Sequence, residues 1–393
     1  MARILLVSHE LSVTGAPNSL LRQARYFMEA GHSVDVWSYS GGALLPRYEE
    51  AGLRPELVAD NRRALREKYE ANPVKYDLVV CNTTRTYRCV DVFRRFRIKV
   101  AWFIRETKLL DEDYWMNPDF AKVFREFGNL YTVSEYAADV VRYYNNRVRV
   151  VYNSVADAFH GFAVPAKAAR FGFIGSLIPE KGIEPLIEAF RRTRRTFPDI
   201  TLTIAGGIPE DAARRLRAAT EDESSIRWLG MVQGPEKAAF FDSIDVLCVP
   251  SLDEPFGLTV AEGAMQGKAI VTTDRTGANF LVDRDNGRIV RAGDVDALAA
   301  ALSDFASMNA DGLRACAEHS RATYLSKGSV DSEREAVLRM LDETTVEPCV
   351  RGRLRDDDKR PLFHEVRYAD GSRRFYFKNL RLVTVKGRGI RTR

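Results

Sequence analysis

The sequence predicts two doubly wound α/β domains in tandem, each with a parallel sheet that helices cover on both faces. Short apolar runs alternate with segments of helical periodicity through both halves of the chain. The length of 393 residues exceeds the size at which a single hydrophobic core stops growing. Residues 156–169 show no clear periodicity and divide the two halves, so we interpret them as a linker.

The first half opens with a short apolar run suited to a buried strand, followed by a glycine loop, a helix and a second strand. The same pattern then recurs along this half. The strands are expected in RILLVS (3–8), YDLVVCNT (76–83), KVAWFIRET (99–107) and the start of LYTVSEYAADVVRYY (130–144). Each of these runs has helical periodicity before or after it, which is typical of a parallel sheet.

The second half repeats this organisation. Strands are expected at 170–176, 200–207, 226–230, 245–251 and 268–274, and helices at 182–197, 211–220 and 235–244. A last helix at 332–344 closes the globular part. We predict domains at 1–155 and 156–328, a closing helix within 329–349 and a tail at 350–393. Ligands bind at the carboxyl ends of strands in such sheets, so the loops there should face a cleft between the domains.

Composition excludes several classes of protein. With 45% hydrophobic and 29% charged residues, and no apolar run near the roughly 18 residues that span a bilayer, an integral membrane protein is not expected. The N-terminal apolar run is too short for a signal peptide, so we expect a cytoplasmic protein, with the inner face of the membrane as a peripheral location. Five cysteines without a C-x-x-C pair argue against a disulfide framework or a zinc site.

The stretch GSLIPEKG, from Gly175 to Gly182, follows a predicted strand and precedes a predicted helix. Its glycines let the backbone approach a ligand, and Lys181 lies near a helix start, where free amides and the dipole favour anions. The stretch therefore indicates a phosphate site, although a tight turn with a solvated lysine is the simpler alternative. It is not a Walker A loop, and no G-x-G-x-x-G follows a strand.

The stretch EPFGLTVAE places one carboxylate before a Pro-Phe-Gly turn and a second one eight positions later. Pro255 prevents a helix from running back through Glu254, whereas a helix can start near Gly257. Glu254 should therefore lie on a loop and Glu262 about one turn inside the helix, with the unpaired amides of residues 256–259 between them. Carboxylates suit sugar hydroxyls and free amides suit phosphate oxygens. Paired carboxylates also serve glycoside hydrolysis, but the lysine would then have no role.

Taken in order, these motifs resemble the retaining glycosyltransferases of the GT4 type (glycosyl transferases group 1), which have the GT-B fold of two Rossmann-like domains. The resemblance covers residues 3 to about 344 and is strongest over 171–301. It rests on GSL…EKG, ITLTIAGG, IRWLGMV, DVLCVPSLDEPFGLTVAEGAMQGKAIVTTDRTGA and NGRIV…GDVDALAAAL.

The resemblance implies the roles of the donor-binding residues. Glu262 would hold the ribose hydroxyls, Lys181 the diphosphate and Glu254 the hydroxyls of the donor sugar. The backbone of Phe256, Gly257, Leu258 and Thr259 would meet sugar and phosphate, the loop Gly230, Met231 and Val232 the base, and Gly15 of the first domain the diphosphate.

Two positions depart from the family pattern. Ser176 stands where the family commonly has an arginine, which removes one cation from the diphosphate site. Arg105, in FIRET, stands where a histidine is frequent, and we expect it to supply positive charge or to contact an acceptor. The catalytic candidates are therefore Lys181, Glu254 and Arg105, and no general base is assigned. His9, after the first strand, either lines the cleft or is a structural histidine.

The expected function is transfer of a sugar from a nucleotide-diphosphate sugar to a saccharide or lipid-linked acceptor with retention, in polysaccharide or glycoconjugate synthesis. We expect no cofactor and no metal. The D-x-D metal pattern does match at 111–113, 283–285, 294–296 and 356–358, but such matches are expected by chance in a chain with 54 acidic residues. The alternative is a catalytically idle GT-B module that binds a glycan or a partner.

The tail is the basic part of the chain. Residues 351–393 carry a net charge of +9, which leaves −4 on residues 1–350. The run HEVRYADGSRRFYFKN predicts a β-hairpin around an Asp-Gly turn, which is simpler than a nucleic-acid module of interleaved arginines and aromatics. We expect the tail to dock on the acidic body or to bring the chain to anionic membranes, and no nucleic-acid partner.

Overall fold

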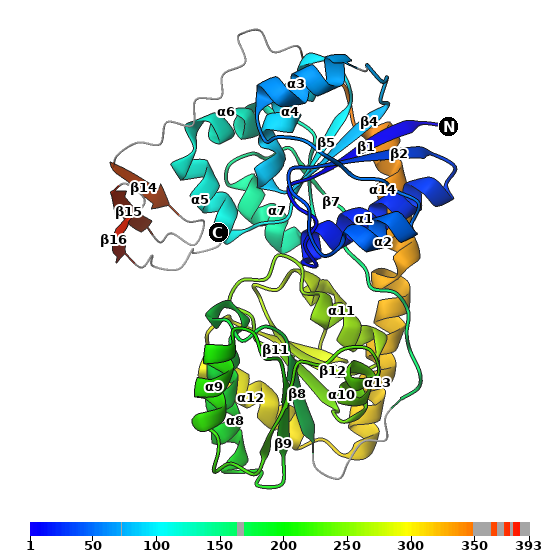
Figure 1. Cartoon of the computed structure of the whole chain (residues 1–393). Helices are drawn as coiled ribbons and strands as arrows, with labels where there is room; N and C mark the ends of the chain where they lie inside the picture. Colours follow the sequence, from blue (N-terminus) through cyan, green and yellow to red (C-terminus); the bar gives the residue numbers. More distant parts are fainter. Residues whose placement is uncertain (72, 163–168, 349–362, 368–372, 378–379, 386–393) are drawn as a thin grey trace. The chain divides into compact units, whose positions relative to one another are not determined.

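The computed structural model describes residues 1–71, 73–162, 169–348, 363–367, 373–377 and 380–385 (Figure 1). The chain divides into two compact units. Unit 1 comprises residues 1–151 and 334–393, and unit 2 comprises residues 152–333. The sequence placed the first boundary at 155 and treated the last helix as a separate element. In the structure the chain returns to unit 1 within that helix.

Unit 1 is built on a seven-stranded sheet in the order β3-β2-β1-β4-β5-β6-β7, with every neighbouring pair parallel. Its strands are β1 (Arg3–Ser8), β2 (Ser33–Ser38), β3 (Glu56–Leu57), β4 (Leu78–Asn82), β5 (Val100–Ile104), β6 (Leu130–Thr132) and β7 (Val148–Val150). The predicted runs therefore form β1, β4, β5 and β6. The two edge strands are short, with two residues in β3 and three in β7.

Helices connect these strands. They are α1 (Gly15–Glu29), α2 (Leu45–Glu50), α3 (Arg62–Ala71), α4 (Tyr87–Arg95), α5 (Lys108–Met116), α6 (Pro118–Glu126) and α7 (Glu135–Arg142), with a 3₁₀ turn η1 (Thr84–Thr86). Helices α3, α4 and α6 pack against one another on one side of the sheet (Figure 1). Their core is aromatic, because the fully buried ring of Trp102 lies edge-on to Phe120, Phe124 and Phe127 with centroids 5.6–5.8 Å apart.

Helix α14 (Val330–Glu343) and the residues after it tie the end of the described body to unit 1. The ammonium of Lys99 donates to the carbonyl of Leu341 at 2.7 Å. The carboxylate of Glu347 accepts from the amide of Gly128 at 3.0 Å and from Asn129 Nδ2 at 2.9 Å. These bonds join residues more than 200 positions apart, so unit 1 is completed by residues that follow unit 2 in the sequence.

Unit 2 repeats the design with a six-stranded parallel sheet in the order β10-β9-β8-β11-β12-β13. Its strands are β8 (Arg170–Ile174), β9 (Thr201–Ala205), β10 (Ile226–Gly230), β11 (Val246–Val249), β12 (Ala269–Thr273) and β13 (Gly287–Val290). This is the strand order of a doubly wound fold that binds ligands at the carboxyl ends of its strands. The two parallel α/β domains of the GT-B expectation are confirmed.

The helices of unit 2 are α8 (Ile183–Arg194), α9 (Glu210–Ala218), α10 (Pro235–Asp242), α11 (Leu258–Met265), α12 (Val295–Ala306) and α13 (Ala310–Thr323), with short turns η2 (Pro179–Lys181), η3 (Gly277–Leu281) and η4 (Tyr324–Gly328). Figure 1 shows α8, α9 and α12 on one side of the sheet and α10, α11 and α13 on the other. A Cβ at Gly263 would lie 2.4 Å from Leu247 Cδ2, so this glycine lets α11 pack closely on β11.

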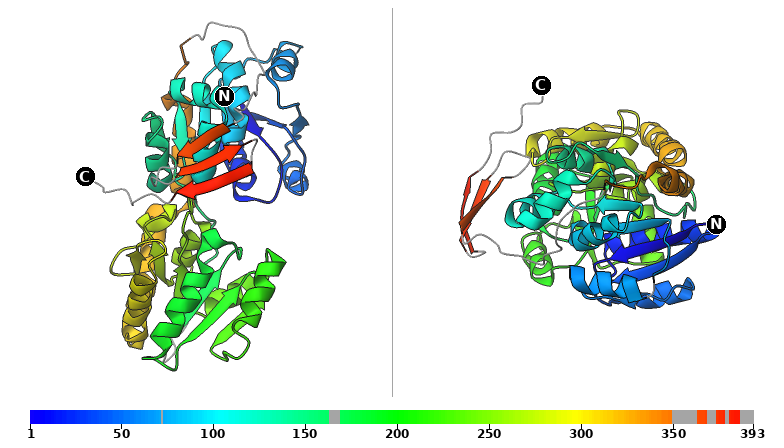
Figure 2. Two further views of the ribbon diagram at one scale, coloured as in Figure 1. Left: turned by 90° about the vertical axis from the view of Figure 1, so that its left-hand side faces the viewer. Right: turned by 90° about the horizontal axis from the view of Figure 1, so that it is seen from above.

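The tail contains a separate antiparallel sheet of β14 (Phe363–Arg367), β15 (Arg373–Phe377) and β16 (Leu380–Val385), whose three strands are seen side by side in Figure 2. The predicted hairpin strands are β14 and β15. The third strand was not predicted, and the Asp-Gly turn lies outside the described residues, as does Cys349.

The described helices include none that is both long and apolar enough to cross a membrane. The four cysteines within the described residues, Cys81, Cys89, Cys248 and Cys316, are free and buried.

Candidate active site

The loop after β8 is held close to its neighbours by backbone contacts that require glycine. Gly206, after β9, has a φ of +149°, and a Cβ there would lie 2.1 Å from the carbonyl oxygen of Gly175. The amide of Leu177 donates to the carbonyl of Ile208 at 2.7 Å. The two loops therefore run against each other at the carboxyl edge of the sheet, as the sequence predicted for a ligand site.

Lys181 lies in the 3₁₀ turn η2, two residues before α8 begins, rather than at the helix start itself. Gly182 follows with a φ of +68°, and a Cβ there would lie 2.1 Å from the carbonyl oxygen of Pro250. The amide of Leu252 donates to the carbonyl of Glu180 at 2.7 Å. The turn is thus pressed against the loop after β11, and the ammonium of Lys181 forms an ion pair with the carboxylate of Glu254.

The backbone of Glu254 is fixed from the other side by the loop after β12. Its amide donates to the carbonyl of Arg275 and its carbonyl accepts from the amide of Gly277, both at 3.0 Å. Gly257 has a φ of +94°, and a Cβ there would lie 2.8 Å from Thr276 Cγ2. The Pro-Phe-Gly turn between the two carboxylates is therefore clamped, and its glycine is required both by φ and by the close approach.

Helix α11 begins immediately after this turn, at Leu258. Within the described part of the chain, the backbone amides of residues 256–259 find no carbonyl partner. The side chain of Phe256 is buried, whereas Leu258 and Thr259 are half-buried. A helix that starts in this way presents amide donors and the positive end of its dipole to an anion.

Glu262 is the fifth residue of α11, as predicted, and its partner was not anticipated. The ammonium of Lys237 lies 2.6 Å from Glu262 Oε1, with side-chain exposures of 35% and 22%. Lys237 comes from the first turn of α10, where a cation is disfavoured by the helix dipole. That unfavourable position is the signal in the sequence that could have identified it.

The remaining predicted donor contacts lie on exposed loops. Met231 follows β10 and its side chain is 52% exposed. Ser176 is exposed at the start of the glycine-rich loop. A Cβ at Gly207 would lie 3.3 Å from Met231 Cγ, so the loop after β10 lies beside the loop after β9. Unit 2 therefore carries all of the predicted donor residues except Gly15.

In unit 1, Asn82, which ends β4, links the predicted residue Arg105 to the first turn of α1, where the predicted residue Gly15 lies. Gly15 is the first residue of α1, which begins without a side-chain cap. Asn82 Nδ2 donates to the carbonyl of Ala16 at 3.0 Å, and Asn82 Oδ1 accepts from Arg105 Nε at 2.5 Å. The buried guanidinium of Arg105 also lies over the ring of Phe103, 4.7 Å from its centroid.

Glu106 was not singled out from the sequence, although it is next to Arg105. Its carboxylate accepts from the amide of Arg105 at 2.9 Å and from the amide of Thr84 at 3.2 Å. Burial raises the pKa of Glu106 to about 7, and the nearby carboxylate of Asp113 acts in the same direction. Thr84 Oγ1 donates to Asp113 Oδ2 at 2.6 Å.

His9, after β1, lies near this group. Its Nδ1 is 3.1 Å from the hydroxyl of Thr83, and burial lowers its pKa. A small cavity of ≈ 100 Å³ opens beside these residues, lined by Asp60, Thr84, Arg85, Tyr87, Arg88, Asp113, Asn117 and Phe120. It combines carboxylates, guanidiniums and aromatic rings, which are the groups that bind sugar hydroxyls and sugar faces.

A larger groove of ≈ 540 Å³ lies along α9 and β10, beside Gly230, where a Cβ would lie 3.5 Å from a guanidinium nitrogen of Arg217. It is lined by Arg217, Ala218, Thr220, Glu221, Ile226, Trp228 and Leu229. The indole of Trp228 already donates to Thr220 Oγ1 at 2.9 Å. We place the candidate site at the loops with converging charges and free amides rather than here, because size alone does not identify a site.

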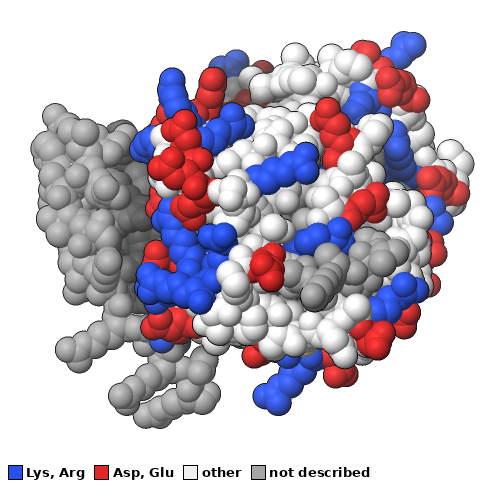
Figure 3. Space-filling view, turned by 90° about the horizontal axis from the view of Figure 1, so that it is seen from below, with Lys and Arg blue, Asp and Glu red and all other residues white. Residues whose placement is uncertain are grey.

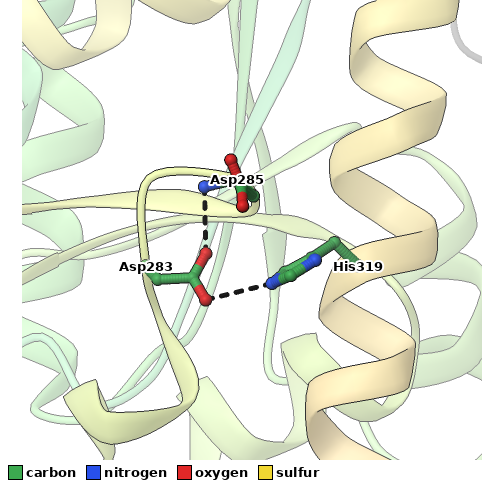
Figure 4. Close-up of side chains that lie close together, drawn as sticks. All are labelled: Asp283, Asp285 and His319. Carbon is green, nitrogen blue, oxygen red and sulfur yellow. Dashed lines mark hydrogen bonds and ion pairs between the residues drawn. The ribbon is translucent and has the colours of Figure 1, made fainter.

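One D-x-D match falls in a group with metal-ligating atoms. Asp283, Asp285 and His319 have ligand atoms within 4.8 Å of one another (Figure 4). His319 Nε2 lies 3.0 Å from Asp283 Oδ2, and Asp283 Oδ1 accepts from the amide of Asp285 at 2.9 Å. These contacts describe a turn that is hydrogen-bonded to α13. The expectation that the reaction needs no metal stays a prediction.

Charge on the face shown in Figure 3 is mixed, with basic and acidic side chains side by side. The ion pairs of α8 have the same character, since Arg192 contacts both Glu188 and Asp296. Such pairs are worth little in stability and do not form an area of one sign. The visible surface therefore gives no indication of a polyanion-binding face.

Family models match both halves of the chain. Residues 1–151 match the model described as "Glycosyl-transferase family 4", and residues 168–308 match the model described as "Glycosyl transferases group 1". The two matches together include every residue of the candidate site in both units.

Curated relatives match over part of their length. A phosphatidyl-myo-inositol mannosyltransferase of Mycolicibacterium smegmatis is 36% identical over 126 residues, which are 32% of this chain and 32% of the relative. A glycogen synthase of Mycobacterium tuberculosis is 34% identical over 39% of each chain. The lipopolysaccharide core glycosyltransferase LpsE of Rhizobium meliloti is 28% identical over 45% of this chain and 51% of its own. The aligned part is thus 32–51% of the length of these relatives.

Solved structures match over most of the described fold. Anabaena HepE in complex with UDP-glucose has a TM-score of 0.71 at 16% identity and covers 87% of this chain and 100% of its own. The lipopolysaccharide outer core galactosyltransferase WaaB has a TM-score of 0.71 at 14% identity, over 86% of this chain and 99% of its own. At these identities the likeness shows the fold alone.

Proposed function

This chain belongs to the group 1, family 4 glycosyltransferases, and on that premise we propose that it transfers a sugar from a nucleotide-diphosphate sugar to a saccharide or lipid-linked acceptor. The observation that carries the proposal is the Lys181–Glu254 ion pair beside the free amides at the start of α11. This arrangement places cation, carboxylate and amide donors around a single small region of unit 2.

In the proposed reaction, the bond between the anomeric carbon and the diphosphate oxygen breaks while the acceptor oxygen bonds to the same carbon. Negative charge grows on the diphosphate, where Lys181 and the α11 amides stabilise it. The carboxylate of Glu254 orients the hydroxyls of the sugar, and Glu262 holds the ribose. The acceptor attacks on the same face of the sugar from which the diphosphate departs, so the anomeric configuration is retained. This geometry also lets the acceptor hydroxyl give its proton to the departing diphosphate.

We assign the acceptor to unit 1, where Arg105 and the cavity lined by Thr84, Arg85 and Asp113 lie near the ends of β4 and β5. Its carboxylates and guanidiniums suit a hydroxyl-rich, uncharged head group. The named relatives act in mannolipid, glycogen and lipopolysaccharide synthesis, so we propose polysaccharide or glycoconjugate synthesis as the setting. The proposal includes no metal and no cofactor, and a cytoplasmic protein that meets lipid-linked acceptors at the membrane surface.

The test is a thermal-shift screen of the nucleoside diphosphates UDP, GDP and ADP, followed by donor hydrolysis with the matching nucleotide sugars. UDP and UDP-glucose head the screen because they are bound in the HepE structures. Glu262→Ala should weaken nucleotide binding by about 1.5–3 kcal/mol, the range for hydrogen bonds to charged groups. Unchanged affinity in a folded variant would remove Glu262 from the site.

A catalytically idle binding module is the second candidate, because Ser176 stands where a second diphosphate cation is common in the resembled family. Such a module would bind a nucleotide or a glycan. It would lack the slow hydrolysis of the donor that an active enzyme shows in the absence of acceptor. If the wild-type chain hydrolyses a nucleotide sugar and Lys181→Ala does not, the chain is an enzyme.

A further inference from the structure

Lys237 and Glu262 come together from two helices at the carboxyl edge of the unit 2 sheet. Lys237 is the third residue of α10 and Glu262 the fifth residue of α11, and the ammonium lies 2.6 Å from Oε1. Both side chains are less exposed than those of the ion pairs on α8, where Glu188 is 47% and Arg192 is 41% exposed. The pair therefore lies in a partly desolvated place, where charged hydrogen bonds are stronger than at the surface.

Lys237 lies in the first turn of α10, where an acidic partner would stabilise its charge. In the first turn of a helix a cation opposes the dipole, and an acidic residue is preferred there. Glu236, next to it, is exposed and forms no ion pair with Lys237 within the described residues, whereas Glu262 reaches it from another helix. The lysine is thus directed to the carboxylate that the proposed function assigns to the ribose.

The two groups have complementary hydrogen-bonding capacity. A carboxylate only accepts, through four lone pairs, and Lys237 occupies one of those on Oε1. An ammonium only donates, and two of its three protons remain after the bond to Glu262. A hydroxyl both donates and accepts, so one hydroxyl can donate to the carboxylate and accept from the ammonium at the same time. A vicinal diol fits this pair better than it fits a lone carboxylate.

We propose that Lys237 and Glu262 act as a single ribose clamp, in which one ribose hydroxyl donates to Glu262 and accepts from Lys237. The inference rests on the proposed function, because it gives Glu262 the ribose. It adds a specificity-determining residue from α10 and makes the site selective for a ribose diol over a deoxyribose. Lys237 also fixes the plane of the carboxylate before the nucleotide binds.

The experiment measures dissociation constants of UDP, GDP and ADP, and of their 2′-deoxy and 3′-deoxy counterparts, for the full chain and for Lys237→Met. The wild-type chain should prefer the ribonucleotide to at least one deoxynucleotide by tenfold or more. Lys237→Met should weaken the ribonucleotide by about tenfold, the loss of one charged hydrogen bond, and the deoxynucleotide lacking the clamped hydroxyl much less. The preference itself should therefore shrink.

Two variants separate this role from a structural one. Lys237→Arg keeps a donor at the same place and should restore most of the preference. Arg192→Met breaks a more exposed ion pair of the same unit and should change neither affinity nor preference. Equal weakening of ribo- and deoxynucleotides by Lys237→Met, or no weakening, overturns the clamp while the proposed function stands. If no nucleoside diphosphate binds the wild-type chain, the proposed function fails together with the clamp.

Discussion

Single residues of the donor region act in pairs that the local sequence does not join. Lys181 is paired with Glu254 and Lys237 with Glu262, so each carboxylate of EPFGLTVAE has an ammonium from another element. Each ion pair holds one of these carboxylates in place, at the position proposed for the donor. The two lysines are therefore as much a part of this site as the two carboxylates.

Lys181 should act on the diphosphate and not on the nucleoside. Lys181→Ala removes one charge-assisted contact to phosphate, worth about 1.5–3 kcal/mol, so affinity for UDP should fall by roughly tenfold or more. Affinity for uridine should stay within twofold of wild type. Isothermal titration of both ligands measures this, and equal losses for UDP and uridine would remove Lys181 from the phosphate site.

Glu106 should make the stability of unit 1 depend on pH. Burial raises its folded pKa from 4.5 to about 7, so its contribution is fully present below pH 4.5 and is lost as pH rises through 7. Glu106→Gln stays neutral at every pH and escapes this loss. The stability of wild type relative to the variant should therefore decline between pH 4.5 and 7.5.

Urea unfolding followed by tryptophan fluorescence suits this measurement, because Trp37, Trp102 and Trp115 lie in unit 1. Glu67→Gln, on the exposed face of α3, is the control and should show a difference from wild type that is constant with pH. A constant difference for Glu106→Gln as well would contradict the raised pKa.

At the scale of elements, glycines set how closely the loops approach. The turn η2 reaches the loop after β11 only because Gly182 has no side chain, and α11 begins just after Gly257, which caps it in a left-handed conformation. Both glycines determine where a carboxylate or a lysine ends up. The geometry of the site is therefore a property of loop packing as much as of the charged residues.

Gly182→Ala should disturb the site and the fold together. Its Cβ would meet the carbonyl oxygen of Pro250 at 2.1 Å, and a left-handed φ costs alanine about 1–2 kcal/mol. With overpacking of about 1–3 kcal/mol added, the unfolding free energy should fall and Lys181 should move away from Glu254. We expect lower thermal stability and weaker UDP binding.

Gly293→Ala is the matched control in the same unit, since Gly293 has a φ of +78° but its Cβ would only touch Leu252 at 3.6 Å. It should lower stability modestly and leave UDP binding unchanged. If both variants bind UDP equally well, the approach of η2 to the loop after β11 does not position Lys181.

The whole molecule combines two units of the same construction with a basic tail. Chain from both ends contributes to unit 1, because α14 and Glu347 return to β6 after unit 2 is complete. The tail of +9 follows a body of −4, and its strands β14, β15 and β16 form a sheet of their own. Opposite charges of this size attract the tail to the body or to an anionic surface.

Removal of the tail tests these two roles. A chain ending at residue 349 keeps Glu347 and its bonds to unit 1, so a lower melting temperature would report docking of the tail on the body. Co-sedimentation with phosphatidylserine vesicles at low salt tests the membrane role, in which each basic residue contributes about 1 kcal/mol. The membrane role fails if the full chain does not bind, and docking fails if truncation leaves the melting temperature unmoved.

Periodicity, proline and glycine determined much of this protein from the sequence alone. Local signals predicted the alternating strands and helices, the loop at Glu254 and the position of Glu262 within a helix. The spacing of apolar residues and the Pro-Phe-Gly turn act within a few residues, so they can be read without the tertiary structure. The short edge strand β3 carried too little signal, because its pairing with β2 rather than its composition makes it a strand. The third tail strand β16 was not predicted, although its sequence LRLVTV has the composition of a strand.

Only the tertiary structure decided which charges meet. Lys237 lies 25 residues before Glu262, and Asn82 lies 23 residues before Arg105, and nothing in either local sequence names the partner. Strand order and the packing of the connecting helices bring the carboxyl ends of separate strands to one edge, and side-chain partners follow from that arrangement. The sequence therefore determined the parts of the site, whereas the fold determined their pairing, because electrostatic partners depend on distance in space and not along the chain.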